Sequence, residues 1–520
     1  MWAAVRSLTG RRRDSDAVSG ITADSLNRHY ASISSDTNYQ PPQRKHTAAC
    51  RDQEAVSEWQ VFQFLDTLST TAAGMDKLPA WFLRIGAPFF YQAVTRLFNM
   101  SIATSSVPCQ WKVAYINPVP KPTAPQQDSD YRPISITPIL SRILERIIVK
   151  NFLYPAITEP LASLNFSDQY AFRPTGSTTA ALIAILHSIT DLLSSNPYVI
   201  VLAADFSKAF DSVRHSTLMQ KTAMLDIPDT VYNWLIDFLS GRRHCTRYNG
   251  LTSSMLDISA SIIQGSAVGP VSYIINAADL STVTAGNRIH KYADDTYIVI
   301  PATNVLSRAA ELDHLSQWAL VNNLKLNRAK SAEIIFSSSR HKCLEPHPPE
   351  LPDIKRVTSI TILGVTVTNH LSVSEHVSGL ITKCAQSLHA LKILRCHGMS
   401  DEALTVIYKA VVLAKLVYAT PAWWGFTAAR DKQRIEAFIR RGVRLRYYGR
   451  DDPTFAELVE DTEDTLFTTV LRNSQHVLHN MLPDKRTYTY CLRPRRHELS
   501  LTTKGDSRNF FERQLYKDMY

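Results

Sequence analysis

The sequence YVIVLAADFSKAFD at residues 198–211 decides the fold prediction. Its first seven residues, Tyr198 to Ala204, are all apolar or small. Such a run is typical of a strand that is buried on both faces. Asp205 follows at once, so we expect its carboxylate to lie where that strand leaves the core.

A second segment, HKYADDTYIVI at residues 290–300, places two carboxylates between strand-forming residues. This pattern predicts a β-hairpin with Asp294 and Asp295 at its tip. Asp-Asp fits a tight hairpin turn poorly, because such turns favour Asn-Gly or Asp-Gly. A residue choice that works against local structure indicates a function.

Three carboxylates on two neighbouring strands repel one another unless a cation lies between them. Carboxylate oxygens with open coordination positions suit Mg²⁺ or Mn²⁺, which also bind phosphate groups. Two such ions can hold the attacking and leaving oxygens of an in-line phosphoryl transfer. The two segments together therefore predict a two-metal site, although an Asp-Asp turn on its own is usually a solvated loop.

The composition is that of a globular protein: of 520 residues, 45% are apolar and 20% are charged. These fractions exclude bulk disorder and low-complexity fibres. The formal net charge of +10 is compatible with a nucleic-acid or anionic-membrane partner, and equally with a mildly basic surface. The seven cysteines are scattered and form no C-x-x-C pair, which disfavours a disulfide framework or a structural zinc site.

Periodicity divides the chain into regions. Residues 1–55 are polar and predict a linker-like basic leader, and helical periodicity begins at Val56. Strand and helix patterns alternate over residues 198–365, and helical periodicity returns over residues 376–446. We find no repeat of fixed period, and neither a signal peptide nor a transmembrane segment is predicted.

Further motifs occur in order around the two acidic segments: DYRPIS at 130–135, QYAFRPTGST at 169–178, QGSAVGP at 264–270, NLKLN at 323–327 and LGV at 363–365. With these motifs the chain resembles the reverse transcriptase part of non-LTR (LINE-like, jockey-like) retrotransposons. The segment at Asp205 is similar to that family's palm motif A. The segment at Asp294 is similar to its Y/F-A-D-D box.

The resemblance implies an α+β fold of the right-hand polymerase class, with fingers, a ferredoxin-like palm built on an antiparallel sheet, and a helical thumb. We expect fingers and palm at residues 56–368, with the core motifs at 101–368. The thumb is expected at 369–447 and a C-terminal tail region at 448–520.

The resemblance also implies roles in catalysis. Asp205 and Asp294 would ligate two Mg²⁺ or Mn²⁺ ions, and Asp295 would be the adjoining carboxylate. The backbone carbonyl of Phe206 could add a ligand. Lys330 is the candidate proton donor to the leaving pyrophosphate, with Lys325 nearby in the same motif.

Five residues are implied in nucleotide binding. Phe210 would stand under the sugar and exclude a 2′-hydroxyl, although its spacing also fits a core aromatic residue. Gln264 and the backbone of Gly265 would contact the nucleotide and template, although a plain turn fits them as well. Lys121 and Arg132 would hold the triphosphate, unless they are ordinary solvated cations.

Four arginines are candidates for nucleic-acid binding. Arg173 would order the fingers or contact a template phosphate. Arg434, Arg441 and Arg444 could share one helical face and hold a nucleic-acid backbone. A solvated helix face is the alternative for these three.

The implied activity is that of an RNA-directed DNA polymerase, which transfers deoxynucleotides to a primer 3′-hydroxyl on an RNA template. The expected partners are an RNA template, a DNA primer or target, and dNTPs, with no membrane. The expected location is intracellular, in the nucleus, the cytoplasm or both. An upstream endonuclease is expected to be absent from this chain. The alternatives are an inactive retroelement relic that still binds nucleic acid, and a group II intron maturase-like protein.

Overall fold

The structure, a computed structural model, describes residues 20–46, 55–121, 124–159, 164–337, 347–485, 496–501 and 506–518. Much of the predicted basic leader, residues 1–19 and 47–54, lies outside these ranges. The chain divides into two compact units. Unit 1 comprises Met1–Leu164, Lys208–Ala278 and Leu320–Leu324, and unit 2 comprises Asn165–Ser207, Asp279–Ala319 and Lys325–Tyr520.

Unit 1 contains a small mixed sheet in the order β2-β1-β5-β6, with β7 also paired to β5. β1 and β5 are parallel, and the other pairs are antiparallel. The strands are β1 (Val113–Pro120), β2 (Tyr131–Ile136), β5 (Arg242–Tyr248), β6 (Leu251–Thr252) and β7 (Leu256–Ile258).

The helices of unit 1 are α2 (Ala23–Ile33), α3 (Glu58–Asp66), α4 (Ala80–Ile85), α5 (Ala87–Ala103), α6 (Ile139–Ile148), α7 (Tyr154–Thr158), α9 (His215–Thr222), α10 (Asp229–Leu239) and α11 (Val268–Asn276). α2 lies within the segment predicted as a leader. Its N-terminus is closed by a capping box between Thr22 and Ser25. Leu26 and Tyr30 of α2 are buried in a small cluster with residues of β1 and β2.

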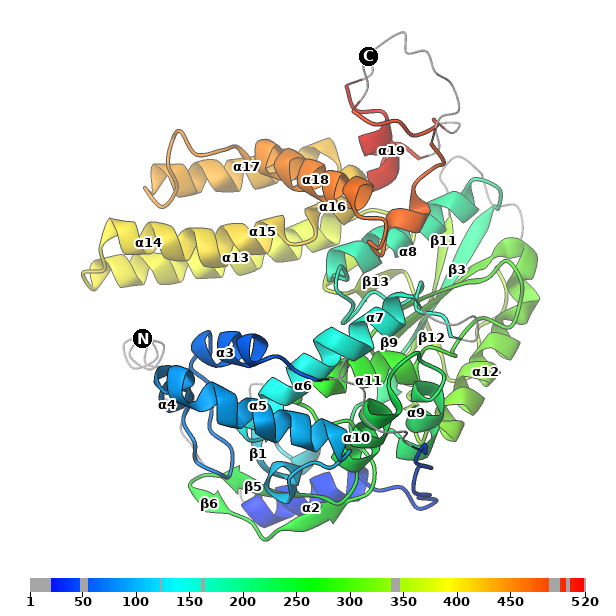
Figure 1. Cartoon of the computed structure of the whole chain (residues 1–520). Coiled ribbons are helices and arrows are strands. Elements are labelled where there is room, and N and C mark those ends of the chain that lie inside the picture. Colours follow the sequence, from blue (N-terminus) through cyan, green and yellow to red (C-terminus); the bar gives the residue numbers. More distant parts are fainter. Residues whose placement is uncertain are drawn as a thin grey trace. The chain divides into compact units, whose positions relative to one another are not determined.

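Unit 2 is built on a five-stranded sheet in the order β12-β11-β3-β9-β8 (Figure 1). All neighbouring pairs are antiparallel except β11 with β12. The strands are β3 (Tyr198–Ala204), β8 (Arg288–Tyr292), β9 (Asp295–Pro301), β11 (Ala332–Ser337) and β12 (Lys355–Val357). The predicted buried strand is confirmed as β3, the central strand of this sheet.

Two short ladders extend unit 2. β4 (Phe206–Ser207) pairs with β10 (Lys325–Leu326), and β13 (Ser359–Ile362) pairs with β14 (Val365–Thr368). α8 (Thr178–Leu193) begins at the N-cap Ser177 and packs against β3, β8 and β9. α12 (Arg308–Val321) follows β9 in the chain. The antiparallel strands and helices of unit 2 agree with the predicted α+β class.

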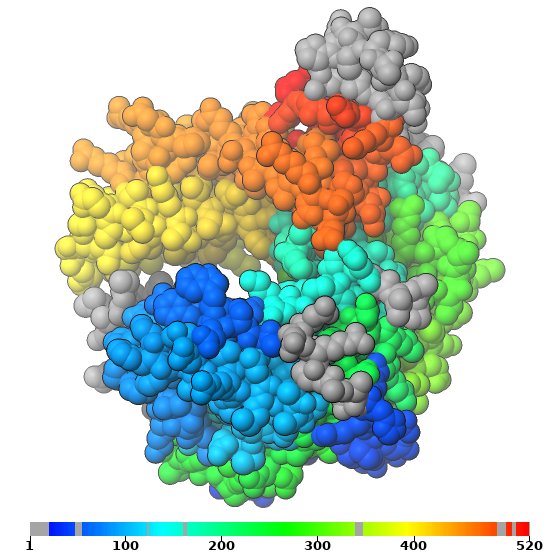
Figure 2. Space-filling model, in the orientation of Figure 1, coloured from blue at the N-terminus to red at the C-terminus, as the bar shows by residue number. Residues whose placement is uncertain are grey.

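The chain after β14 is helical, as the periodicity predicts. Its helices are α13 (Ser374–Cys396), α14 (Asp401–Ile407), α15 (Ala414–Val417), α16 (Thr420–Trp423), α17 (Ala429–Arg444), α18 (Phe455–Arg472) and α19 (Phe510–Leu515). α13 packs against α14, α15 and α17, and Figure 2 shows the side chains of these yellow and orange segments in contact. One hydrophobic core joins these helices to α8 and the five-stranded sheet, and Trp423 is fully buried in it.

One helical run in the described part of the chain, Asp401–Phe426, is long and apolar enough to cross a membrane. The same run buries Leu404, Tyr408 and Val412 in the core of unit 2. Core helices of globular proteins meet this length and composition test too.

Candidate active site

The three predicted carboxylates lie at the paired ends of β3 and β9. The last pair of the β3–β9 ladder joins Ala204 to Thr296, so Asp205 and Asp295 are the next residues on the two facing strands. The β8–β9 hairpin is confirmed. Its closing pair is Tyr292 with Asp295, so the two-residue turn is Ala293–Asp294, and Asp295 opens β9 instead of sharing the tip.

The electrostatics of Asp295 show that these carboxylates act on one another. Burial raises the pKa of the Asp295 carboxyl to about 6, and the negative charges of Asp294 and Asp205 add to this effect. A divalent cation would relieve the repulsion, and carboxylate oxygens are the ligands that Mg²⁺ and Mn²⁺ prefer. No group of three or more His, Cys, Asp or Glu side chains in the described ranges forms a ready-made metal cage. The donor chemistry nevertheless fits such an ion.

Backbone contacts fix Asp205 from one side. Its carbonyl oxygen accepts a hydrogen bond from the Asn327 amide at 2.8 Å, and its own amide donates to Ser331 Oγ at 3.2 Å. Ser331 Oγ in turn donates to the Asn327 carbonyl at 2.8 Å. Lys330 is an exposed residue of this same turn. The structure thus places the motif that carries Lys330 directly against the backbone of Asp205.

Phe206 and Lys325 lie on the adjoining β4–β10 ladder. The Phe206 ring is buried and packs against Trp318, with ring centroids 5.6 Å apart. Lys325 is exposed and pairs with Ser207. The side chain of Phe206 therefore belongs to the core, and only its backbone carbonyl could serve as the predicted ligand.

A second group of predicted residues forms within unit 1 around Gln264. The Gln264 side chain donates from Nε2 to Asp211 Oδ1 at 2.7 Å. Its backbone carbonyl accepts from the Ser135 amide at 2.7 Å. The next residue, Gly265, has φ +114°, and a Cβ there would collide with the Ser135 carbonyl oxygen. Glycine is therefore required at this close approach of two backbone segments.

Asp211 and Lys208 join this group, although the sequence motifs assigned neither a role. Burial raises the pKa of the Asp211 carboxyl to about 6, while the hydrogen bond from Gln264 and the charges of Lys121 and Lys208 oppose the shift. Both residues lie in the segment 198–211 that first indicated the fold. Their charges, close to Phe210 in the segment that follows the apolar strand, were the signal that could have identified them.

The two triphosphate candidates lie on the β1–β2 hairpin. Lys121 follows β1 and donates from Nζ to the Ser129 carbonyl at 2.9 Å. Arg132 is exposed on β2, opposite Val119 of β1. The charge of Lys121 acts on Asp211, so the structure brings Lys121 and Gln264 around one carboxylate.

The Phe210 ring packs as the core-aromatic alternative predicts, and it is not fully buried. Its ring is stacked on Tyr273 of α11, with centroids 4.6 Å apart and an angle of 24° between the planes. Its carbonyl accepts from the Ile262 amide at 2.7 Å. The residue is only half-buried, so packing fixes the ring while part of it stays accessible.

The four candidate arginines differ in their contacts. Arg173 donates from Nη1 to the Phe166 carbonyl at 2.7 Å, and burial lowers the pKa of its guanidinium. Arg434 is paired with Asp431 at 2.7 Å. Arg441 and Arg444, near the end of α17, are exposed. Arg173 therefore orders its own loop, whereas Arg441 and Arg444 belong to a set of exposed arginines on α17 that also includes Arg430, Arg434 and Arg440.

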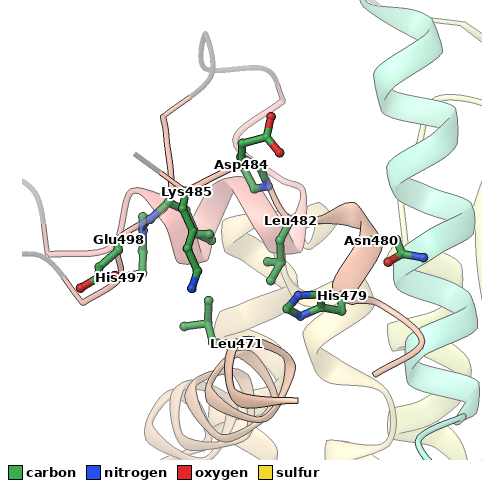
Figure 3. Close-up of a pocket in the computed structure, with 10 residues that line it drawn as sticks. Leu471, His479, Asn480, Leu482, Asp484, Lys485, His497 and Glu498 are labelled. Carbon is green, nitrogen blue, oxygen red and sulfur yellow. Dashed lines mark hydrogen bonds between the residues drawn. The ribbon is translucent and has the colours of Figure 1, made fainter. Parts of the chain in front are cut away.

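A pocket in the C-terminal region contains none of the predicted site residues. It is lined by residues between Leu471 and Leu499, and Figure 3 shows Lys485 extending toward Leu471. His479 is bonded through Nδ1 to the Val470 carbonyl and His497 through Nε2 to the Leu515 carbonyl. One ring nitrogen of each imidazole is therefore engaged in a hydrogen bond to a backbone carbonyl.

The segment that carries the three aspartates is similar in sequence to known proteins. Residues 119–367 match the family described as "Reverse transcriptase (RNA-dependent DNA polymerase)". The chain is 27% identical over 396 residues to the "RNA-directed DNA polymerase from mobile element jockey" of Drosophila melanogaster, covering 72% of this chain and 42% of that protein. It is 25% identical over 363 residues to the "Probable RNA-directed DNA polymerase from transposon X-element" of the same organism, covering 68% of this chain and 39% of that protein.

The chain thus spans less than half the length of these two relatives. Among solved structures it is similar to telomerase from Candida tropicalis in complex with a fragment of telomeric RNA. That similarity has 12% identity and a TM-score of 0.39, and it covers 75% of this chain and 67% of that one. The family match, the jockey and X-element relatives and the α+β architecture agree with the predicted right-hand polymerase class. Residues 119–367 of this chain therefore match the reverse transcriptase family, and the chain is similar to the RNA-directed DNA polymerases of non-LTR retrotransposons.

Proposed function

We propose that the chain is an RNA-directed DNA polymerase that transfers deoxynucleotides to a primer 3′-hydroxyl on an RNA template. The observation that carries this proposal is the position of Asp205, Asp294 and Asp295 at the facing ends of β3 and β9, inside the segment that matches the reverse transcriptase family.

The three carboxylates supply the negative charge that such a transfer needs. Asp205 and Asp294 would hold two Mg²⁺ or Mn²⁺ ions, with Asp295 and the Phe206 carbonyl as adjoining oxygen donors. Bound there, the ions would polarise the reacting phosphate and lower the pKa of the primer hydroxyl. The hydrogen bonds of Asn327 and Ser331 to the Asp205 backbone support its orientation. Lys330, in the same turn, would donate a proton to the departing pyrophosphate.

The group around Gln264 would bind the incoming nucleotide. Asp211 orients the Gln264 amide, and Lys121 and Arg132 would neutralise the triphosphate. Gly265 would let the backbone approach the nucleotide and the template. Phe210, held on Tyr273, would exclude a ribose 2′-hydroxyl.

The nucleic acids would be an RNA template and a DNA primer. Exposed Arg441 and Arg444 would contact the phosphate backbone, and Arg173 would order the loop of the fingers that contains it. In this assignment residues 56–368 are fingers and palm, 369–447 the thumb and 448–520 a tail region. The protein would act inside the cell, in the nucleus or the cytoplasm.

Primer extension by the purified chain tests this function. With a primer annealed to RNA, the four dNTPs and Mg²⁺, we expect extension that disappears when the metal is chelated. Asp205→Asn and Asp294→Asn each remove a carboxylate without changing side-chain volume. We expect each variant to lose at least about 1,000-fold in rate, because metal-based charge stabilisation contributes several kcal/mol.

A binding control separates the polymerase from an inactive relic. Filter binding of the same primer–template measures affinity without chemistry, and both Asn variants should bind as tightly as the unmodified chain at equal salt. Extension that survives in either variant contradicts the two-metal assignment. Binding without extension by the unmodified chain would instead identify a relic.

A further inference from the structure

The catalytic hairpin has a strained turn. Ala293, the first residue of the two-residue turn that carries Asp294, has φ +56°. A left-handed conformation costs a residue with a Cβ roughly 1–2 kcal/mol, and tight turns of this kind normally place glycine there. Ala293 is also buried. The turn therefore depends on contacts from outside the hairpin.

The side chain of Gln169 supplies such a contact. Its Oε1 accepts hydrogen bonds from the amides of Ala293 at 3.1 Å and Ala171 at 3.0 Å. Two N–H donors on one oxygen fix the orientation of the amide. Gln169 is 1% exposed, so water cannot replace the bond to Ala293, and losing it would leave a buried amide unsatisfied.

The segment around Gln169 is itself fixed to the hairpin. Lys291 of β8 donates its amide to the Asp168 carbonyl at 2.7 Å and accepts from the Tyr170 amide at 2.9 Å. Its Nζ lies 3.0 Å from Asp168 Oδ1 and donates to the Leu280 carbonyl at 2.8 Å. The side chains of Lys291 and Asp168 are buried. Residues 168–171 therefore form a rigid support behind the turn.

We propose that Gln169 is a positioning residue for the catalytic carboxylates. By holding the Ala293 amide, it keeps the turn in the left-handed conformation that directs Asp294 toward the same site as Asp205. This inference rests on the proposed polymerase function, and it assigns Gln169 no contact with substrate. A displacement of about 1 Å at a reacting centre can cost about 100-fold in rate.

Gln169→Met tests the proposal, because methionine keeps the length and flexibility of the side chain and removes the acceptor. We expect kcat for dNTP addition to fall by about 30- to 100-fold, with the KM for dNTP changed less than about threefold, since only the alignment of the carboxylates is lost. The Mg²⁺ concentration for half-maximal rate should rise several-fold. Adding Ala293→Gly, which relaxes the turn, should restore part of the rate.

Amide hydrogen exchange gives a readout that does not require activity. The peptide containing Ala293 should exchange faster in Gln169→Met than in the unmodified chain, without metal or substrate. Gln514→Leu is the matched control, because it removes another buried glutamine whose amide bonds Glu463 in unit 2. Should Gln169→Met fail to fold, Gln169→Asn keeps the amide and withdraws its oxygen by one methylene.

The outcomes distinguish this inference from the proposed function. If the unmodified chain extends primers and Gln169→Met matches it in kcat, metal requirement and exchange at Ala293, the positioning role is wrong. If the unmodified chain does not extend primers, the proposed function fails, and the exchange experiment still decides whether Gln169 fixes the turn.

Discussion

Asp295 and Asp211 both have a raised pKa, but their surroundings predict different behaviour. At Asp295, burial acts together with the charges of Asp294 and Asp205, so every neighbouring effect favours the protonated form. At Asp211, burial is opposed by Gln264, Lys121 and Lys208. The ionised form of Asp295 therefore needs a nearby cation to stabilise it. The ionised form of Asp211 is already stabilised within the protein, by the Gln264 hydrogen bond and the charges of Lys121 and Lys208.

Mg²⁺ should stabilise the protein more at pH 7.5 than at pH 5.5. Because the folded-state pKa of Asp295 lies near 6, above the ordinary value of 3.8, its protonated form stabilises the fold at low pH. That stability is lost as the pH rises through about 6, and a cation then relieves the repulsion. Thermal unfolding with and without Mg²⁺ at the two pH values measures the difference.

Asp295→Asn is the control for this experiment, because asparagine has no carboxylate to titrate. Its Mg²⁺-dependent shift in Tm should depend much less on pH. An equal Mg²⁺ effect at both pH values in the unmodified chain contradicts the assignment of Asp295 to the metal site.

Asp211→Ala should weaken nucleotide binding more than Asp211→Asn. Alanine removes the acceptor of the Gln264 side chain, whereas asparagine keeps an oxygen in its place. A hydrogen bond to a charged group contributes about 1.5–3 kcal/mol, so we expect the KM for dNTP to rise at least about tenfold in the alanine variant. Steady-state kinetics of both variants measure the KM for dNTP. If the two variants have the same KM, the prediction that Gln264 binds the nucleotide is wrong.

Among the elements, α17 offers a test of nucleic-acid binding that needs no catalysis. Arg441→Gln with Arg444→Gln removes two exposed charges, so we expect weaker binding of single-stranded RNA. The slope of log K against log salt should fall in magnitude by about 1.4, because each phosphate that an arginine neutralises on a single strand contributes about 0.7 to the slope. Filter binding over a range of salt concentrations measures both quantities.

Arg434→Gln is the matched control on the same helix. Arg434 is paired with Asp431 and also donates to Ser378 Oγ at 3.0 Å, so removing it takes little free charge from the surface. A salt slope that changes as much in this variant as in the double variant would contradict the assignment of the phosphate contacts to Arg441 and Arg444.

The sequence predicted β3 and the β8–β9 hairpin well because their signals are local. The apolar run ending at Ala204 has no charged residue, and the strand-forming residues around Asp294 show no helical period. The turn was predicted less well. Ala293 and Asp294 form it, not the two aspartates, because the Gln169 contact stabilises an alanine in a conformation that its own preference disfavours.

The supporting contacts could not be predicted from local patterns. Gln264 and Asp211 are 53 positions apart, and Gln169 and Ala293 are 124 positions apart. Each hydrogen bond exists only because the fold brings two distant segments together. α2 was missed for a related reason. Its few apolar residues suffice only because β1 and β2 supply the remainder of the small cluster that buries them.

At the scale of the whole molecule, the family match is shorter than the cores. The match ends at residue 367, whereas the core of unit 2 continues through α13, α17 and α18 to Leu515. In unit 1, Leu26 and Tyr30 lie before the match begins and pack against Ile116 and Tyr131. Helices outside the matched segment therefore complete the core of unit 2 and a small hydrophobic cluster in unit 1.

A fragment of residues 119–367 should consequently be much less stable than the whole chain. It would expose the faces of α8 and the β13–β14 ladder that α13 and later helices cover. We expect a lower Tm, a less cooperative transition and stronger binding of a hydrophobic dye. Circular dichroism melting of both proteins measures this, and a fragment that melts cooperatively at the same temperature would contradict it.

The interleaving of the two units governs when a growing chain can fold on the ribosome. Unit 1 receives its last residues at Leu320–Leu324, and β3 must wait for both neighbours, β9 and β11, of which the second ends at Ser337. Translation of the residues between Ala204 and Ser337 takes about 7–27 s at about 5–20 residues per second. During that interval the most apolar strand of the sheet has emerged without the strands that will cover its edges. The nascent protein is therefore most exposed to aggregation and to chaperone capture while β9 and β11 are still being synthesised.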